Sequence, residues 1–463
     1  MKKKITFAYY WANHNIGDIT ISKGFLNLIK NELPDYSTNI ILRYYQKGTN
    51  DYKEAERSLK KDFPDINIVG APTKELFSSF QENEEKIVFK NTLIGENAKF
   101  ENEGLKFHHQ SRFPISNLEE KDELMDVLKG NKKFLDTTLS KHLNDDFLSA
   151  IKESDLVFYG PGMVYNSGGC DGSYVTPEVV LHTVLPILLA SEMNIPYGIN
   201  QSFESIDDGI TGQFLRKLLL NADYVFCRDG DSLRFLKEKR ILCSKMGFYP
   251  DTTVCFESCD DTWAKNFIET NDLKSGKFII FVPWFYYLES RLYYYSVQAA
   301  VLLDEIVEKT DIPVVIVPPQ TSELSTIEEL LVPQLSEKTR ERSVILKEYW
   351  SPSEAKALIG QSRIVISMDN HISMLSVPAG IPTINITTYF YHLGRKFHLF
   401  KDIGLSNFLY DFWEDPISNI IQTALWINSN WDEAKEMTTF SGDYLKKRAK
   451  ESIEIIQKII ETK

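Results

Sequence analysis

The sequence predicts an α/β protein with two Rossmann-like, doubly wound domains that face each other across a cleft. Short apolar segments of strand length alternate with longer segments whose apolar residues recur at helical spacing, and this alternation occurs twice. A polar stretch at 259–276 interrupts it, as expected of a domain boundary. The 463 residues also exceed what one ordinary core accommodates. We therefore expect an N-terminal domain at 1–262 and a C-terminal domain at 276–463 that ends in long helices.

The composition is that of an ordinary globular protein, with 43% hydrophobic and 25% charged residues. A net charge of −13 argues against a general nucleic-acid binder and against adhesion to anionic lipid. The five cysteines include no C-x-x-C pair, so we expect reduced thiols and no metal site. A local basic pocket for a phosphate group remains compatible with this overall charge.

We expect neither a secretory signal nor a transmembrane segment. The apolar residues after the N-terminal lysines are few, rich in Tyr, and end in a polar stretch at 13–15 without a small-residue cleavage site. The longest apolar run, 179–190, contains His182 and Pro186 and is too short to cross a bilayer. These features predict a cytoplasmic protein.

The chain opens with a predicted strand at 5–10 and a polar turn that contains Asn15, Gly17 and Asp18. A helix with apolar residues at helical spacing follows, up to Pro34. The glycine lets backbone approach a ligand closely, and the aspartate is expected to cap the helix. A helix cap without a ligand is an equally good interpretation. The same reasoning predicts strands at 39–45 and 66–69 and a helix at 51–61.

Near 74–146 the alternation of strand-like and helix-like apolar segments weakens, and charged residues become more frequent. We interpret this stretch as an insertion, a lid or an acceptor-binding loop. A strand is then predicted up to Tyr159, and the turn after it contains Gly160 and Gly162. Glycines after a strand let backbone N–H groups line an anion or sugar site. Turn geometry alone would also explain them. A helix at 176–190 and a strand at 196–202 follow.

A second junction combines a strand at 222–227, the cation Arg228 and a helix at 233–239. An arginine at a strand end can bind a phosphate or carboxylate through two parallel hydrogen bonds. The alternative is an ion pair with Asp229 or Asp231 that holds the loop.

In the second half, the stretch 364–386 predicts a strand, a polar turn, a short helix and another strand. Asp369, Asn370 and His371 occupy the turn, where parallel sheets bind ligands and where a helix N-terminus favours an anion. A histidine there can act as a general acid or as an anion ligand. Further predicted elements are strands at 278–282, 314–317 and 344–346 and helices at 292–309, 326–335 and 352–359.

Arg395 and Lys396 follow a cluster of aromatic residues and His392. Such a group suits an acidic sugar or a phosphate, although a solvated charge pair is equally plausible.

Several of these segments occur in the same order in a known family. N-x-G-D at 15–18, G-P-G at 160–162, R-D-x-x-S at 228–232 and the segment around His371 resemble the polysaccharide pyruvyl transferase family. The resemblance covers most of the chain apart from 74–146. It implies a two-domain fold of the GT-B type, with a terminal helix crossing back to the first domain. It also implies transfer of a pyruvyl (enolpyruvyl) group from phosphoenolpyruvate to a sugar of a cell-surface glycan, as in exopolysaccharide biosynthesis.

The resemblance also implies roles for individual residues. His371 would be the acid, while Arg228, Arg395 and Lys396 would hold the donor. Asp369, beside the histidine, is a further candidate catalytic residue that the family pattern does not supply. Substrate-binding roles would fall to Asn15, Gly17, Asp18, Gly160, Gly162 and Asn370. No metal or cofactor is implied. The acceptor would be a glycan or a lipid-linked sugar, which allows peripheral contact with a membrane.

One position departs from the family, because Asp369 stands where an arginine is usual. A carboxylate there would repel an anionic donor by roughly 4 kcal/mol at 4 Å with an effective dielectric near 20. The aspartate could be paired with a cation such as Arg395, could be the base that activates an acceptor hydroxyl, or could indicate another donor. The alternatives are therefore a GT-B glycosyltransferase that uses a nucleotide sugar and a catalytically inactive sugar-binding homologue.

Overall fold

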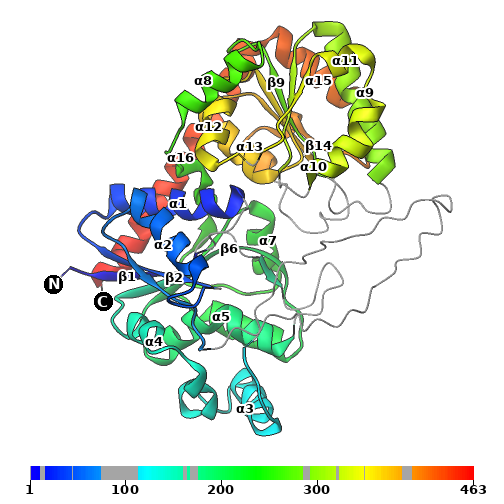
Figure 1. Cartoon of the computed structure of the whole chain (residues 1–463). Helices are drawn as coiled ribbons and strands as arrows, with labels where there is room; N and C mark the ends of the chain where they lie inside the picture. The colour runs from blue at the N-terminus through cyan, green and yellow to red at the C-terminus, as the bar shows by residue number, and fades with distance from the viewer. Residues whose placement is uncertain are drawn as a thin grey trace.

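The computed structural model shows two parallel sheets, each with helices on both faces (Figure 1). It describes most of the chain. The described residues are 2–10, 16–43, 45–74, 113–159, 164–166, 176–284, 292–319, 323–348, 350–387 and 399–462.

The first sheet has the strand order β3-β2-β1-β4-β6-β7-β8, and β5 pairs additionally with β6. Every pairing is parallel. The strands are β1 (Lys4–Tyr10), β2 (Ser37–Leu42), β3 (Asn67–Val69), β4 (Leu156–Tyr159), β5 (Val164–Asn166), β6 (Tyr197–Ser205), β7 (Tyr224–Cys227) and β8 (Met246–Phe248). The helices are α1 (Ile16–Glu32), α2 (Asn50–Asp62), α3 (Leu118–Lys129), α4 (Asp145–Lys152), α5 (Pro177–Glu192), α6 (Ile210–Leu220) and α7 (Gly230–Glu238).

The second sheet has the order β11-β10-β9-β12-β13-β14, again with parallel pairings. The strands are β9 (Ile279–Val282), β10 (Val314–Ile316), β11 (Ser343–Ile345), β12 (Ile364–Ser367), β13 (Thr383–Thr387) and β14 (Leu409–Asp411). The helices are α8 (Asp261–Thr270), α9 (Leu292–Thr310), α10 (Glu323–Thr326), α11 (Glu337–Glu341), α12 (Pro352–Gly360), α13 (Asn370–Ser376), α14 (Leu399–Asp402), α15 (Ile417–Ser429) and α16 (Trp431–Thr462).

Both sheets show the doubly wound order, in which the first strand lies inside and later strands are added on either side of it. The predicted fold class, two Rossmann-like domains, is therefore confirmed. The point where the order reverses lies between β1 and β4 in the first sheet and between β9 and β12 in the second. Ligands of such sheets bind beyond the carboxyl ends of the strands at this point.

The central strands are buried on both faces, as parallel strands covered by helices must be. Helix α1 is fixed on the first sheet by aromatic packing: the Phe25 ring lies 5.1 Å from that of Phe7 and 4.6 Å from that of Phe158. The N-terminal turn of α1, which carries Gly17, is thereby held at the carboxyl end of β1.

One expectation about the first domain needs correction, because helix α1 begins at Ile16, so Asp18 lies in its first turn and is not its cap. The second half of the expected insertion packs on the first domain, because α3 contacts α5 and α6. Its first half, 75–112, lies outside the described residues.

The segment between the two expected domains is helical. Helix α8 contacts α12 beside the second sheet, and the backbone N–H of Asp260 donates to the carbonyl of Ser353 over 3.0 Å. Residues from about 260 onward thus pack with the second sheet, while the domain limits themselves stay a prediction.

Helix α16 crosses from the second domain back to the first, as the resemblance implied (red in Figure 1). It contacts α1 and the 3₁₀ turn Thr252–Cys255 of the first domain. The Arg448 guanidinium lies 4.2 Å from the centre of the Tyr249 ring and donates to the carbonyl of Phe248 over 2.6 Å. Lys450 pairs with Glu32 of α1 at 3.0 Å.

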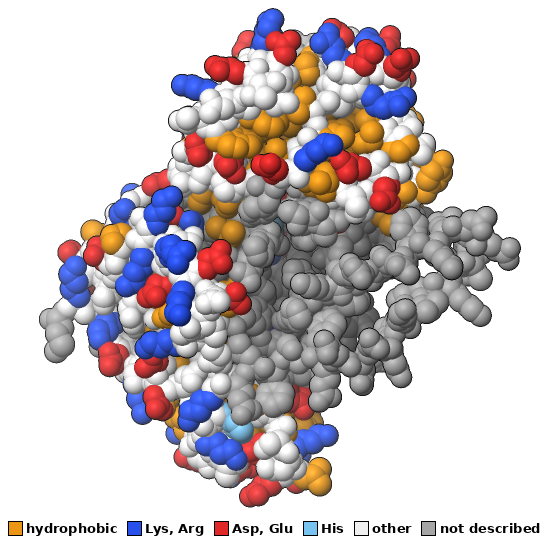
Figure 2. All heavy atoms as spheres, viewed as in Figure 1, with side chains coloured by type: hydrophobic (Ala, Val, Ile, Leu, Met, Phe, Trp, Pro, Cys, Tyr) orange, Lys and Arg blue, Asp and Glu red, His pale blue; other side chains and the backbone are white. Residues whose placement is uncertain are grey.

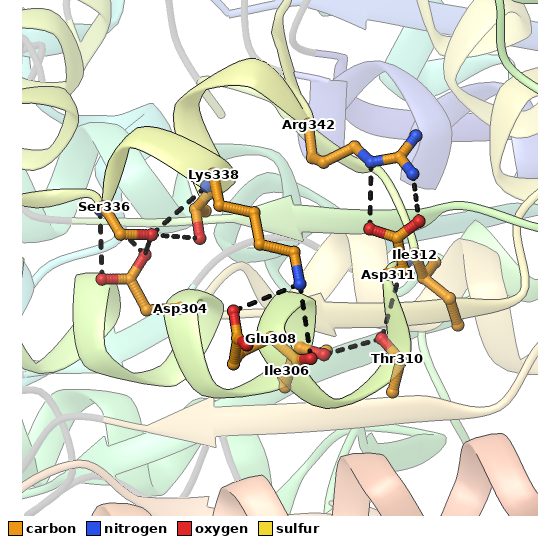
Figure 3. Close-up of polar contacts among 10 residues, drawn as sticks. Asp304, Ile306, Glu308, Thr310, Asp311, Ile312, Ser336, Lys338 and Arg342 are labelled. Atoms are coloured by element: carbon orange, nitrogen blue, oxygen red, sulfur yellow. Dashed lines mark hydrogen bonds and ion pairs between the residues drawn. The ribbon is translucent and has the colours of Figure 1, made fainter.

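On the surface of the second domain, polar side chains join α11 to the C-terminal half of α9 (Figure 3). Ser336, at the N-terminus of α11, donates to Asp304, and Lys338 lies 3.1 Å from Glu308. Arg342 pairs with Asp311 after the end of α9. We call these three contacts the α9–α11 clasp.

Candidate functional site

In each domain, a helix follows the strand at the point where the strand order reverses, and these two helices meet at the domain interface. Helix α1 follows β1, and α13 follows β12, and the two helices are in contact (Figure 1). A Cβ built on Gly17 of α1 would lie within 3.0 Å of Nδ1, Cγ and Cε1 of His371 on α13. Only a residue without a side chain lets the two domains approach this closely.

His371 thus lies at the interface of the domains, and its side chain is 19% exposed. Its Nδ1 is buried and makes no hydrogen bond with any residue in the described part of the chain. Oδ1 of Asp369 lies 3.9 Å from this nitrogen. That separation is too long for a hydrogen bond but short enough for the carboxylate to stabilise a positive imidazolium.

Asp369 is the N-cap of α13 and is 3% exposed. Its Oδ1 accepts the N–H of Ile372 over 2.8 Å. Burial raises the pKa of its carboxyl, although the His371 charge and the N–H groups of the helix oppose the rise; the nearby Asp251 adds to it. The carboxyl of Asp369 thus accepts one N–H of this helix terminus, and the binding of a donor anion there stays a prediction.

Arg228 follows β7 and is 9% exposed, so it points into the molecule. Its Nη1 lies 3.8 Å from Oδ2 of Asp251. The expected alternative partners have other roles: Asp229 caps α7 by accepting from Ser232, and Asp231 pairs with Arg234. Of the carboxylates in the described part of the chain, that of Asp251 lies 3.8 Å from the Arg228 guanidinium, and the predicted role of the arginine stays a prediction.

Asp251 pairs with the arginine and precedes a turn that lies against the helix of the histidine. It is 3% exposed and caps the 3₁₀ turn Thr252–Cys255 by accepting the N–H of Thr253 over 3.0 Å. That turn contacts both α1 and α13. The sequence patterns assigned no role to Asp251, so its pairing with Arg228 was missed.

A second contact between the domains was also missed. Asp402 of α14 accepts the N–H of Gly230, the first residue of α7, over 2.7 Å. Burial raises the pKa of this carboxyl. A carboxylate from the second domain thus lies at the N-terminus of the helix that follows Arg228. The residues are 172 positions apart in the chain, and no local pattern relates them.

The remaining expected site residues are only partly placed. Asn370 is the first helical residue of α13 and is partly exposed. Gly17 is buried against His371. Asn15, Gly160, Gly162, Arg395, Lys396 and the side chain of Asp18 lie outside the described residues. Their roles stay predictions.

In the described part of the chain, no three His, Cys, Asp or Glu side chains are grouped as metal ligands. None of its helices has the length and apolarity needed to cross a bilayer.

Solved structures of other proteins have the same two-domain arrangement. A glycosyltransferase from Rickettsia africae ESF-5 superimposes with a TM-score of 0.54 at 13% identity, covering 100% of this chain and 99% of its own. MnaA of S. aureus, solved with UDP, gives 0.53 at 12% identity over 98% and 95%. UGT2 of Phytolacca americana gives 0.52 at 10% identity over 99% of both chains. At such identities the similarity establishes the fold alone, and that fold is GT-B.

No curated protein sequence matches the chain. The model of the polysaccharide pyruvyl transferase family, by contrast, matches residues 15–388. This range begins in the turn before α1 and ends just after β13, so it includes both faces of the interface described above. The chain therefore belongs to the polysaccharide pyruvyl transferase family.

Proposed function

We propose that this protein transfers a pyruvyl group from phosphoenolpyruvate to two hydroxyl groups of a sugar, which forms a cyclic ketal and releases phosphate. The observation that carries the proposal is the meeting of His371 with Gly17 across the domain interface, beside the buried Arg228–Asp251 pair. Family membership supports the same reaction. The proposed acceptor is a sugar of a surface glycan, either free or lipid-linked, on the cytoplasmic side.

In the proposed reaction His371, as imidazolium, gives its proton to the methylene carbon of the donor. The central carbon becomes electrophilic, one sugar oxygen bonds to it, and the phosphate leaves with the electrons of its C–O bond. A second sugar oxygen then completes the ketal. Of the two hydroxyl protons released, one restores the imidazolium and the other leaves with phosphate.

We assign Arg228 to the donor because its guanidinium is buried and fixed in direction. An arginine carries five N–H donors in a planar fork, more than one carboxylate can accept. It can therefore remain beside Asp251 and still bind a phosphate or carboxylate of the donor. Arg395 and Lys396 are proposed to supply further positive charge.

The geometry of Asp369 favours one of its three interpretations. Its carboxylate faces its own helix and the imidazole, as the 2.8 Å and 3.9 Å distances show. We propose that it is a positioning residue that orients His371 and stabilises its positive charge. In this role the helix N–H groups offset its repulsion of an anionic donor.

A glycosyltransferase that uses a nucleotide sugar is the second candidate. One observation favours it: similar solved structures include MnaA with UDP and an anthocyanidin 3-O-glucosyltransferase with UDP. The two candidates differ in donor, so thermal melting with phosphoenolpyruvate and with UDP separates them. Stabilisation by UDP and not by phosphoenolpyruvate would favour the second.

The test of the proposed function is phosphate release from phosphoenolpyruvate in the presence of diol-bearing glycans, with the product identified by mass spectrometry. We expect release that depends on the acceptor and a pyruvylated glycan. His371→Gln, which keeps hydrogen bonding but cannot supply the proton, is the matched control. Release that is equal in this variant would contradict the proposed role of the histidine.

A further inference from the structure

A cavity lies in the second domain, and its lining includes none of the interface residues just described. It has a volume of about 380 Å³. Its walls are the first two turns of α9, the loop after β14 and the start of α15. The aromatic, amide and carboxylate side chains of its lining are Tyr294, Gln298, Phe412, Trp413, Glu414 and Asp415. Figure 2 shows hydrophobic and acidic side chains next to each other on the visible face of this domain.

The loop that forms one wall is held in place by its own hydrogen bonds. Oδ1 of Asp411 accepts the N–H groups of Trp413 and Glu414 over 2.7 and 3.2 Å. The N–H of Asp411 in turn donates to Asp415 over 2.7 Å. Phe412 is buried, and its ring meets that of Tyr295 edge-on at 5.6 Å. The cavity is therefore pre-formed and does not depend on closure around a ligand.

The lining combines flat aromatic surface with hydrogen-bonding groups that carry no positive charge. The Tyr294 side chain is 51% exposed and that of Trp413 is 42% exposed. The carboxylate of Glu414 and the amide of Gln298 make no hydrogen bond with residues in the described ranges, so both can bind a ligand. Among the residues that the structure describes, no lysine, arginine or histidine lines the cavity.

We propose that this cavity binds a neutral sugar unit of the glycan acceptor. The apolar face of a pyranose ring stacks on aromatic side chains, and its hydroxyls donate to carboxylates and exchange hydrogen bonds with an amide. Two carboxylates repel phosphoenolpyruvate, phosphate and uronic acids, so the cavity does not serve the donor. Its volume is near the lower end of the ~300–1,000 Å³ typical of small-molecule pockets, which suits one or two sugar rings.

The position of the cavity agrees with this occupant. It opens beyond the carboxyl end of β14, at the same edge of the sheet as His371 beyond β12. β13 separates the two strands, so the lateral offset is about 10 Å at ~4.8 Å per strand. A glycan whose reacting diol lies at His371 can therefore place an inner sugar unit in the cavity. This inference rests on the proposed function, since it concerns the acceptor of that reaction.

The test measures sugar binding without any donor, by saturation-transfer NMR with neutral di- and trisaccharides of glucose, galactose, mannose and N-acetylglucosamine at millimolar concentration. We expect at least one to bind. Trp413→Ala should weaken its binding about tenfold or more, and Glu414→Gln should weaken it less. Trp426→Ala is the matched control, because Trp426 is 37% exposed on α15 but does not line the cavity.

Binding to none of these sugars, or equal binding by wild type and Trp413→Ala, would overturn the inference. Thermal melting with phosphoenolpyruvate is measured on the same variants, where Trp413→Ala should keep the wild-type response. Sugar binding that is lost in Trp413→Ala, in a protein that ignores phosphoenolpyruvate, would uphold the cavity and reject only the proposed function.

Discussion

The charged groups at the domain interface and those of the α9–α11 clasp are chemically alike but differ in burial. In the clasp, the side chains of Arg342 and Asp311 are 43% and 57% exposed. At the interface, Arg228 and Asp251 are 9% and 4% exposed. Exposed pairs cost little to form and contribute little, whereas buried charges lose hydration that a single partner rarely restores.

This difference underlies our proposal of where function is located. Stability does not require an arginine, two aspartates and a histidine at a buried domain interface, because apolar residues would pack there without loss of hydration. We propose that the charged groups at the interface serve binding or chemistry, whereas the clasp is an ordinary surface contact. The following predictions test that distinction, from the largest expected effect to the smallest.

The largest effect is expected for His371→Gln. Loss of the proton donor should lower kcat by about 10²–10⁴. The change lies at a partly exposed position, so the melting temperature should stay near that of wild type. Steady-state phosphate release and differential scanning calorimetry measure the two quantities. A loss of activity below about tenfold would remove the histidine from the chemistry.

Gly17→Ala should lower activity by about ten- to a hundredfold. The new methyl group would overlap the His371 ring, and α1 cannot retreat because Phe25 packs on the sheet and Thr20 contacts Thr253 at 3.3 Å. A displacement of about 1 Å at a reacting group can cost a factor of 10².

Gly360→Ala is the matched control for this substitution. Gly360 lies at the end of α12, and nothing would lie within 4 Å of its new methyl group. Activity should be unchanged, and stability should rise by up to about 1 kcal/mol. Equal kinetics for the two alanine variants would show that the histidine tolerates displacement.

Asp369→Asn should change how stability depends on pH. Because burial raises the pKa of this carboxyl in the folded protein, the folded state binds the proton more tightly than the unfolded state. Wild-type stability should therefore fall as pH rises from 3.8, the ordinary pKa of an aspartate, through the raised pKa, and stay lower above it. Asparagine caps a helix about as well and cannot ionise.

Urea unfolding from about pH 4 to pH 7 tests this, since the variant should gain stability relative to wild type as pH increases. The predicted positioning role adds that kcat falls in the variant although the helix cap remains. If the stability of the variant relative to wild type instead decreased with increasing pH, the raised pKa of Asp369 would be contradicted.

The smallest effect is expected for Arg342→Ala in the clasp. The loss of unfolding free energy should be about 1 kcal/mol or less, should diminish at high salt, and should leave transfer activity unchanged. Urea unfolding at low and high ionic strength measures it. A change in kcat/KM in this variant would show that the clasp and the interface are coupled.

The sequence allowed prediction of the elements whose residues are buried on both faces. The apolar runs of β4, β7, β9 and β12 stand out because nothing polar interrupts them. β8 and β14 were missed, since each has three residues that are only half-buried and such segments show no periodicity. The helix expected at 326–335 is instead divided among α10, a π-helical turn and a 3₁₀ turn that contains Pro333.

Only those residues of the candidate site that lie near the end of a single strand could be predicted from the sequence. Arg228 stands directly after β7, and His371 lies in the first turn of the helix that follows β12, so their positions at the sheet edges follow from local pattern. The contacts that join them were not predictable. Gly17 meets His371, and Asp402 meets Gly230, only because the domains pack in one orientation, and single-sequence patterns carry no information on that orientation.

The central claim is that the buried interface binds phosphoenolpyruvate, and thermal melting with each donor tests it most directly. Phosphoenolpyruvate should raise the melting temperature of the wild type, UDP should not, and the rise should be lost in Arg228→Lys, which keeps the charge but not the planar fork. Stabilisation by UDP without a response to phosphoenolpyruvate, or an equal response in Arg228→Lys, would contradict it.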